Sequence, residues 1–126
     1  MKLLHTFLAL GLAISGAAHA AGPHSHEGKP LHGGVVAEAK DLDYEFVART
    51  DRLQLYVRDH GKPVNPAGAA AKVTLLAGGG SQEVPLQPMA DRLEAAGSFQ
   101  VAAGTKAVAV VALAGKSPVS VRFVLK

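Results

Sequence analysis

Histidine is the residue type in this sequence best suited to chemistry, and its positions are uneven. His24, His26 and His32 fall within one short polar stretch, and His60 lies in a later turn that is rich in Gly and Pro. Imidazole is a good ligand for Cu²⁺, Zn²⁺ and Ni²⁺, and several imidazoles on a flexible segment can converge on one ion. We therefore identify His24, His26, His32 and His60 as candidate metal ligands.

Two carboxylates are candidates to support such a site. Asp59 precedes His60 directly, and Glu45 lies in a predicted strand; either can supply an oxygen ligand or orient an imidazole. If the first strand starts near the turn that holds His60, His32 and His60 would meet. The alternative interpretation is that the histidines belong to a solvated, disordered leader and bind nothing, since a His-x-His pattern alone is not specific.

Other chemistries are opposed by the composition. The chain has no Cys, which excludes thiolate metal sites, thiol catalysis and iron–sulfur clusters. Met89 is the only methionine after Met1, so a methionine-rich Cu(I) site cannot be built within one chain. No serine has a nucleophile-elbow context, no Gly-rich motif joins a strand to a helix, and basic residues are scattered. We expect neither an enzyme nor a nucleic-acid-binding protein.

The first twenty residues have the three parts of a secretory signal peptide. Lys2 supplies a positive charge, residues 3–14 are mostly apolar, and Ala18-His19-Ala20 gives the small-x-small cleavage pattern. The apolar stretch is far shorter than the ~20 residues that span a bilayer, and no other stretch is long enough. We expect cleavage after Ala20, export from the cytoplasm and no membrane span in the mature chain.

The remaining residues 21–126 suit one domain preceded by a tail. Residues 21–32 are polar and contain Gly, Pro and three histidines, so we expect a flexible tail. Organised sequence begins at Gly33, and residues 33–126 are predicted to form a single β domain that is stabilised without disulfides.

Alternating hydrophobicity predicts strands throughout this domain. Residues 41–49 and 52–58 alternate with period two and read as a β-hairpin, and residues 72–77 and 83–87 flank a Gly78-Gly79-Gly80 turn. Further strands are expected at residues 35–36, 90–96, 108–113 and 119–125, and Pro85 is expected to place its strand towards a sheet edge. Short strands without any helical period indicate an all-β, antiparallel β-sandwich of the immunoglobulin-like type, with a small open β-barrel as the alternative.

Part of this domain resembles a known group of proteins. The segments His32-Gly33-Gly34-Val35-Val36, Tyr44-Glu45-Phe46-Val47, Leu55-Tyr56-Val57 and 59–64 (DHGKPV) carry the likeness. Residues 31–76 resemble small exported proteins of Gram-negative bacteria and are similar to segments of periplasmic adaptor proteins from heavy-metal efflux systems. The resemblance implies a periplasmic location and a role in metal handling, and it fixes neither the metal nor a ligand set.

The sequence therefore predicts a periplasmic protein that binds a divalent transition metal through histidines, as a buffer or delivery protein. The alternative prediction is a non-catalytic interaction module whose sheet edge docks on an envelope or efflux partner, because edge strands pair readily with other strands.

Overall fold

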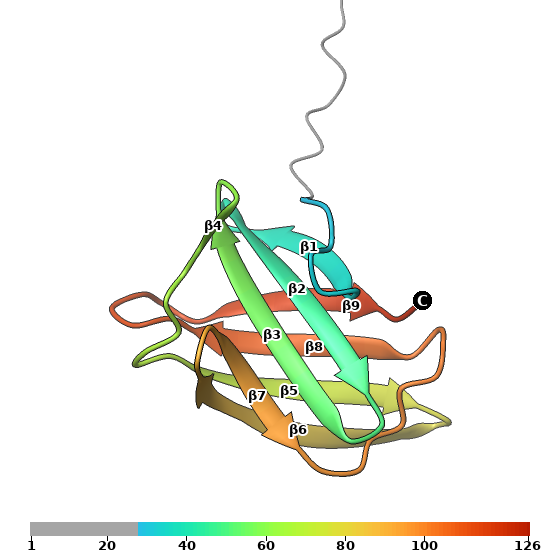
Figure 1. Cartoon of the computed structure of the whole chain (residues 1–126). Helices are drawn as coiled ribbons and strands as arrows, with labels where there is room; N and C mark the ends of the chain where they lie inside the picture. The colour runs from blue at the N-terminus through green and yellow to red at the C-terminus, as the bar shows by residue number, and fades with distance from the viewer. Residues whose placement is uncertain (1–27) are drawn as a thin grey trace, which may run out of the picture.

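The computed structural model describes residues 28–126, so the expected signal peptide and the candidate ligands His24 and His26 lie outside the described residues. This part of the chain is all-β, with nine strands and no helix (Figure 1). The strands are β1 (Val35–Ala39), β2 (Leu42–Arg49), β3 (Arg52–Asp59), β4 (Lys62–Pro63), β5 (Ala70–Ala77), β6 (Gly80–Met89), β7 (Arg92–Ala96), β8 (Lys106–Ala112) and β9 (Val119–Val124).

All strand pairs are antiparallel, and they form one continuous sheet in the order β1-β2-β3-β7-β6-β5-β8-β9, with β4 paired to β3. The two end strands, β1 and β9, lie side by side without a hydrogen-bonded ladder between them (Figure 1). The sheet is therefore nearly closed. The all-β, antiparallel prediction is confirmed, and the arrangement corresponds to the small open barrel that the sequence left as the alternative to a sandwich.

The two predicted hairpins are present, and the structure gives their registers. Arg49 pairs with Arg52 across the turn between β2 and β3, and Ala77 pairs with Gly80 across the turn between β5 and β6. The strands expected at residues 35–36, 90–96, 108–113 and 119–125 are β1, β7, β8 and β9. Two strands are longer than predicted: β5 begins at Ala70 instead of residue 72, and β6 extends over Gly80–Met89 instead of residues 83–87.

Every second residue along the strands faces the inside of the sheet, and these inward residues form the core. Tyr44 and Phe46 on β2 alternate with outward side chains, and Val57 and Leu55 lie opposite them on β3. The rings of Phe46 and Phe123 pack at a centroid distance of 5.3 Å, which joins β2 to β9 through the interior. Burial of each large apolar side chain of this kind contributes about 1.5–3 kcal/mol, so the alternation seen in the sequence determines the inside of the sheet.

Two tight turns lie at the same end of the sheet. Lys40 and Asp41 join β1 to β2, His60 and Gly61 join β3 to β4, and all four residues have positive φ angles. Two-residue loops of this conformation match the twist of an antiparallel pair. Because Asp43 at the start of β2 pairs with Arg58 near the end of β3, the two turns are neighbours.

Residues 28–34, here called the strap, lie across the outer face of β2 and β3 before the chain enters β1. The strap donates three backbone hydrogen bonds to the carboxylate of Glu45: from Leu31 N to Oε1 at 2.9 Å, from His32 N to Oε2 at 2.8 Å, and from Gly34 N to Oε2 at 3.0 Å. Gly34 approaches so closely that a Cβ there would lie 2.4 Å from the carbonyl oxygen of Phe46. The boundary expected at Gly33 thus falls inside a bonded segment.

Arg58 completes the attachment of the strap. Its Nη1 lies 2.8 Å from Glu45 Oε1, and its Nη2 donates to the carbonyl oxygen of Lys29 at 3.0 Å. The Glu45 side chain is 0% exposed and that of Arg58 is 5% exposed. A buried carboxylate is costly unless its oxygens are fully bonded, and here four donors satisfy both oxygens. Burial opposes ionisation, but Arg58 and the three backbone N–H groups outweigh it and lower the pKa of Glu45.

Replacement of Glu45 should therefore release the strap and leave Arg58 buried without its partner. We expect Glu45→Gln to reduce the free energy of unfolding by about 3–5 kcal/mol in urea denaturation, because breaking a buried ion pair strands the remaining charge. Glu38→Gln, on the exposed position of β1, is the matched control and should change it by less than about 0.5 kcal/mol. Equal effects of the two variants would contradict this role for Glu45.

The lowered pKa of Glu45 also predicts an acid dependence. Its contribution to stability is fully present above the ordinary value of 4.5 and is lost as the pH falls from there through the lower pKa of the folded protein. Urea denaturation at a series of acidic pH values should show this loss in the unchanged protein and a weaker pH dependence in Glu45→Gln. The same slope in both proteins would show that other carboxyl groups cause it.

Candidate functional site

His60 is the candidate ligand whose surroundings are best defined. Its ring Nδ1 lies 2.6 Å from Asp59 Oδ1, and its side chain is 85% exposed. Because a carboxylate can only accept a hydrogen bond, Nδ1 must carry the proton, and in the neutral ring the lone pair is on Nε2. A histidine oriented by a carboxylate through one nitrogen, with the other nitrogen open to solvent, is the usual arrangement of a metal-binding imidazole.

Acidic side chains surround this histidine. Glu38, Asp41, Asp43 and His60 line one hollow of about 220 Å³, which we call the histidine corner. Its residues come from strands β1 and β2 and from the β1–β2 and β3–β4 turns, and they converge because these two turns are neighbours. The corner offers one imidazole nitrogen and carboxylate oxygens, the donor types that suit a divalent metal ion.

The acidic surroundings shift the titration of His60. The hydrogen bond and the negative charge of Asp59, with further contributions from Asp41 and Asp43, raise the pKa of His60 above its ordinary value of 6.5. The protonated ring is thus favoured in the folded protein, and the neutral form that could bind a metal is reached at a higher pH than for a free histidine.

The strap begins beside the same corner. A Cβ on Gly28 would lie 3.0 Å from Asp43 Oδ2, so the first described residue is in contact with a carboxylate of the histidine corner. His26 precedes Gly28 by two residues and His24 by four. Chain lengths of at most about 7 Å and 14 Å therefore separate their Cα atoms from that of Gly28.

His32 lies elsewhere. Its ring stacks on Tyr56 with a centroid distance of 3.6 Å and an interplanar angle of 10°. It lines a small hollow of about 60 Å³, together with residues that include Arg58, Pro63 and Asp91, and this hollow does not include His60. The two rings have different partners, Tyr56 for His32 and Asp59 for His60, and the sharing of one site by His32 and His60 stays a prediction.

The two carboxylates considered from sequence have different roles. Asp59 orients His60, as expected for a supporting carboxylate. Glu45 has both oxygens occupied by hydrogen bonds and is buried, so it is not free to act as a ligand. The sequence did not predict that Glu38, Asp41 and Asp43 belong to a site. The available signal was their closeness in the sequence, on and beside the turn that contains Asp41. Within residues 28–126, no three His, Asp or Glu side chains are close enough together to hold a metal ion.

The fold and the corner define a small antiparallel, barrel-like domain with one oriented surface histidine. Comparison of the chain with models of known protein families, with curated proteins and with solved structures found no match. In the part of the chain that the structure describes, no helix has the length and apolar character needed to cross a membrane.

The geometry of His60 predicts its titration in the metal-free protein. Its ring resonances in NMR spectra should titrate with a midpoint above 6.5, and Asp59→Asn should bring that midpoint back towards 6.5. Asp51→Asn, in the turn at the opposite end of β3, is the matched control and should leave the midpoint unchanged. A midpoint at or below 6.5 in the unchanged protein would contradict the orientation of His60 by Asp59.

Proposed function

We propose that the mature protein, residues 21–126, is a periplasmic protein that binds one divalent transition metal ion, Cu²⁺, Zn²⁺ or Ni²⁺, at the histidine corner. The observation that carries the proposal is that Asp59 orients His60 with Nε2 open to solvent, beside the point where the strap begins. His60 supplies one ligand from the domain, and His24 and His26 supply imidazoles from the tail.

The chain length makes this combination feasible. His26 and His24 are only two and four residues from Gly28, which contacts Asp43 in the corner. One imidazole of the domain, two of the tail and a carboxylate such as Asp43 would give four donors of the types that Zn²⁺ and Cu²⁺ accept. His32 is the remaining imidazole predicted from sequence, and its stacking on Tyr56 makes it the least important of the four.

The expected affinity suits a buffer or delivery protein. Two of the ligands come from the expected flexible tail, whose ordering opposes binding because conformational entropy is lost. Exposure of the corner also leaves a route for exchange of the ion with another protein. The resemblance of residues 31–76 to segments of heavy-metal efflux adaptors supports an adaptor as the recipient.

The proposal predicts which histidines matter. In calorimetric titrations of residues 21–126 with Cu²⁺, Zn²⁺ and Ni²⁺ at about pH 7.5, which is above the ordinary imidazole pKa of about 6.5, we expect binding of one ion. Since loss of an orienting partner alone typically costs 10–100-fold in metal affinity, His60→Ala should weaken binding by at least about tenfold. His24→Ala combined with His26→Ala should do the same.

His32→Ala is the matched control for these variants, and it should change the affinity least. Binding should also weaken as the pH falls through the raised pKa of His60, because protonated imidazole cannot bind a metal. The proposal would be contradicted if the unchanged protein bound none of the three ions. It would also be contradicted if His60→Ala bound the ion as tightly as the unchanged protein.

A further inference from the structure

Strand β6 changes its partner along its length. Residues 80–86 pair with β5, whereas only residues 87–89 pair with β7. Beyond Glu94 the chain pairs with β3 instead of β6, and it continues past the start of β3, where Gly97 N and Phe99 N donate to the carbonyl oxygens of Asp51 and Thr50. The side of β6 that faces away from β5 therefore has no strand partner between Gly80 and Leu86 within the described residues.

The register shows which main-chain groups this edge presents. In an antiparallel ladder, alternate residues direct both N–H and C=O to the same side. Val84 and Leu86 face the core with Val73 and Ala71 opposite them, and Pro85 has no N–H to donate to β5. The main-chain groups of Ser81 and Glu83 thus point away from β5 to the open edge. Pro85 offers only its carbonyl there, as the sequence predicted for a proline near a sheet edge.

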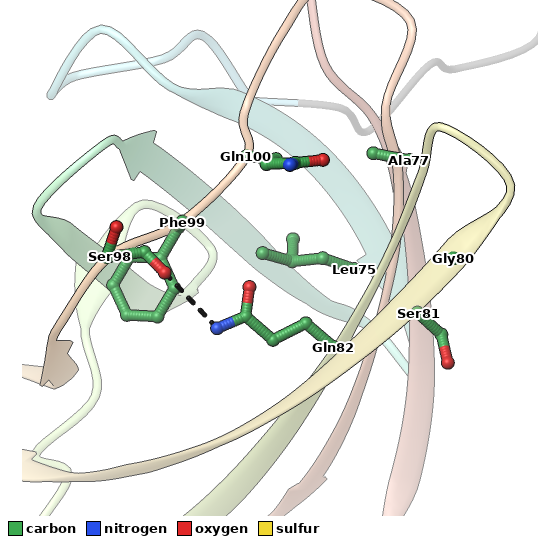
Figure 2. Close-up of a pocket in the computed structure, with 8 residues that line it drawn as sticks. All are labelled: Leu75, Ala77, Gly80, Ser81, Gln82, Ser98, Phe99 and Gln100. Carbon is green, nitrogen blue, oxygen red and sulfur yellow. Dashed lines mark hydrogen bonds between the residues drawn. The ribbon is translucent and has the colours of Figure 1, made fainter.

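A groove runs beside this edge (Figure 2). One wall is β6 at Gly80–Gln82, the other is the segment from Ser98 to Gln100, and the buried side chains of Leu75 and Phe99 line the groove between them. It has a volume of about 340 Å³, and a second hollow of about 860 Å³ shares Phe99 and Gln100 with it.

The width of the groove is set by one side chain. Gln82 Nε2 donates to the carbonyl oxygen of Ser98 at 3.2 Å, the bond drawn in Figure 2. The backbones of β6 and Ser98 are therefore separated by the length of a glutamine side chain and a hydrogen bond, which is more than the ~4.8 Å between paired strands. Gln82 fills this gap, so its exposed side chain must rotate away and release Ser98 before a strand can pair with the edge.

We propose that the open edge of β6 binds an extended segment of a partner protein, which adds as a strand beside residues 81–83. The N–H and C=O groups of Ser81 and Glu83 pair with the main chain of that segment. The segment's residue opposite Gln82 directs an apolar side chain towards Leu75 and Phe99, while its neighbours face solvent. The rim consists mainly of Ser and Gln, so the segment is selected by its extended conformation and alternating pattern more than by its charge.

The walls of the groove favour a single strand over a second copy of this chain. If β6 of a second copy paired here, that copy would bring its own segment 98–100 to the same place. Both segments would then have to fit in the gap between β6 and Ser98, which the side chain of Gln82 alone now spans. This binding site uses none of the residues of the histidine corner, so it goes beyond the proposed metal binding. The peptide-binding and metal-binding proposals can therefore be tested, and contradicted, separately.

A pair of variants tests the site. Glu83→Pro removes the outward N–H without touching the ladder to β5, as Pro85 already does two residues later, whereas Glu83→Ala removes the same side chain and keeps the N–H. A displayed library of random heptapeptides, selected on residues 21–126, should enrich peptides with alternating apolar and polar residues. A synthetic copy of the most enriched peptide should bind the unchanged protein and Glu83→Ala equally. It should bind Glu83→Pro about two- to tenfold more weakly, because one hydrogen bond is lost.

Thermal melting of both variants checks that they fold, and NMR shifts of the Ser81 and Glu83 amides locate the peptide. Enrichment of no peptide, or equal binding to Glu83→Pro and Glu83→Ala, would overturn the proposal. A dimer of the unchanged protein that Glu83→Pro abolishes, detected by light scattering, would replace the partner segment with a second copy of this chain and would overturn it too.

Discussion

The carboxylate of Glu45 is the point at which three parts of this fold are tied together. It lies on the outer face of β2, and it accepts hydrogen bonds from Leu31, His32 and Gly34 of the strap and from Arg58 of β3. A charged group out of contact with water is tolerated only when its donors are all present, so the strap cannot leave without exposing or stranding Glu45. The hydrogen bonds that make burial of Glu45 tolerable therefore also fix the path of residues 28–34.

This path matters for function because it decides where the preceding chain starts. Gly28 contacts Asp43, and Asp43 lines the same hollow as His60. The proposed metal site therefore depends on two independent arrangements, the strap held by Glu45 and the tight turn that presents His60 beside Asp59. The peptide groove beside β6 depends on neither. It arises because one strand pairs with β5 for most of its length and with β7 only at its end.

Much of the fold could be predicted from local sequence. Strand period and turn chemistry are local properties, so a few neighbouring residues are enough to predict them. Examples are the alternating residues of β2 and β3, the Gly78-Gly79-Gly80 turn and Pro85. Closure of the sheet could not be predicted in the same way. Closure depends on contact between β1 and β9, which are the first and last strands of the domain. The local pattern of either strand does not predict which distant strand it will contact.

The same distinction applies to the site. Asp59 and His60 are adjacent, so their hydrogen bond followed from the sequence, whereas the role of Glu45 depends on a segment eleven to fourteen residues earlier. An acidic residue in the middle of the apolar run Tyr44-Glu45-Phe46-Val47 was the available signal. Periodicity marks the Glu45 side chain as outward, but it does not indicate that another segment of the chain will cover it.

NMR titration of the isotopically labelled protein, residues 21–126, with Zn²⁺ tests most directly whether the strap brings the tail to His60. We expect the ring resonances of His60 to shift together with those of His24 or His26 and with the amides of Gly28 and Asp43, while the His32 ring keeps its position on Tyr56. Shifts confined to the tail, with the His60 ring unchanged at saturating Zn²⁺, would contradict the account.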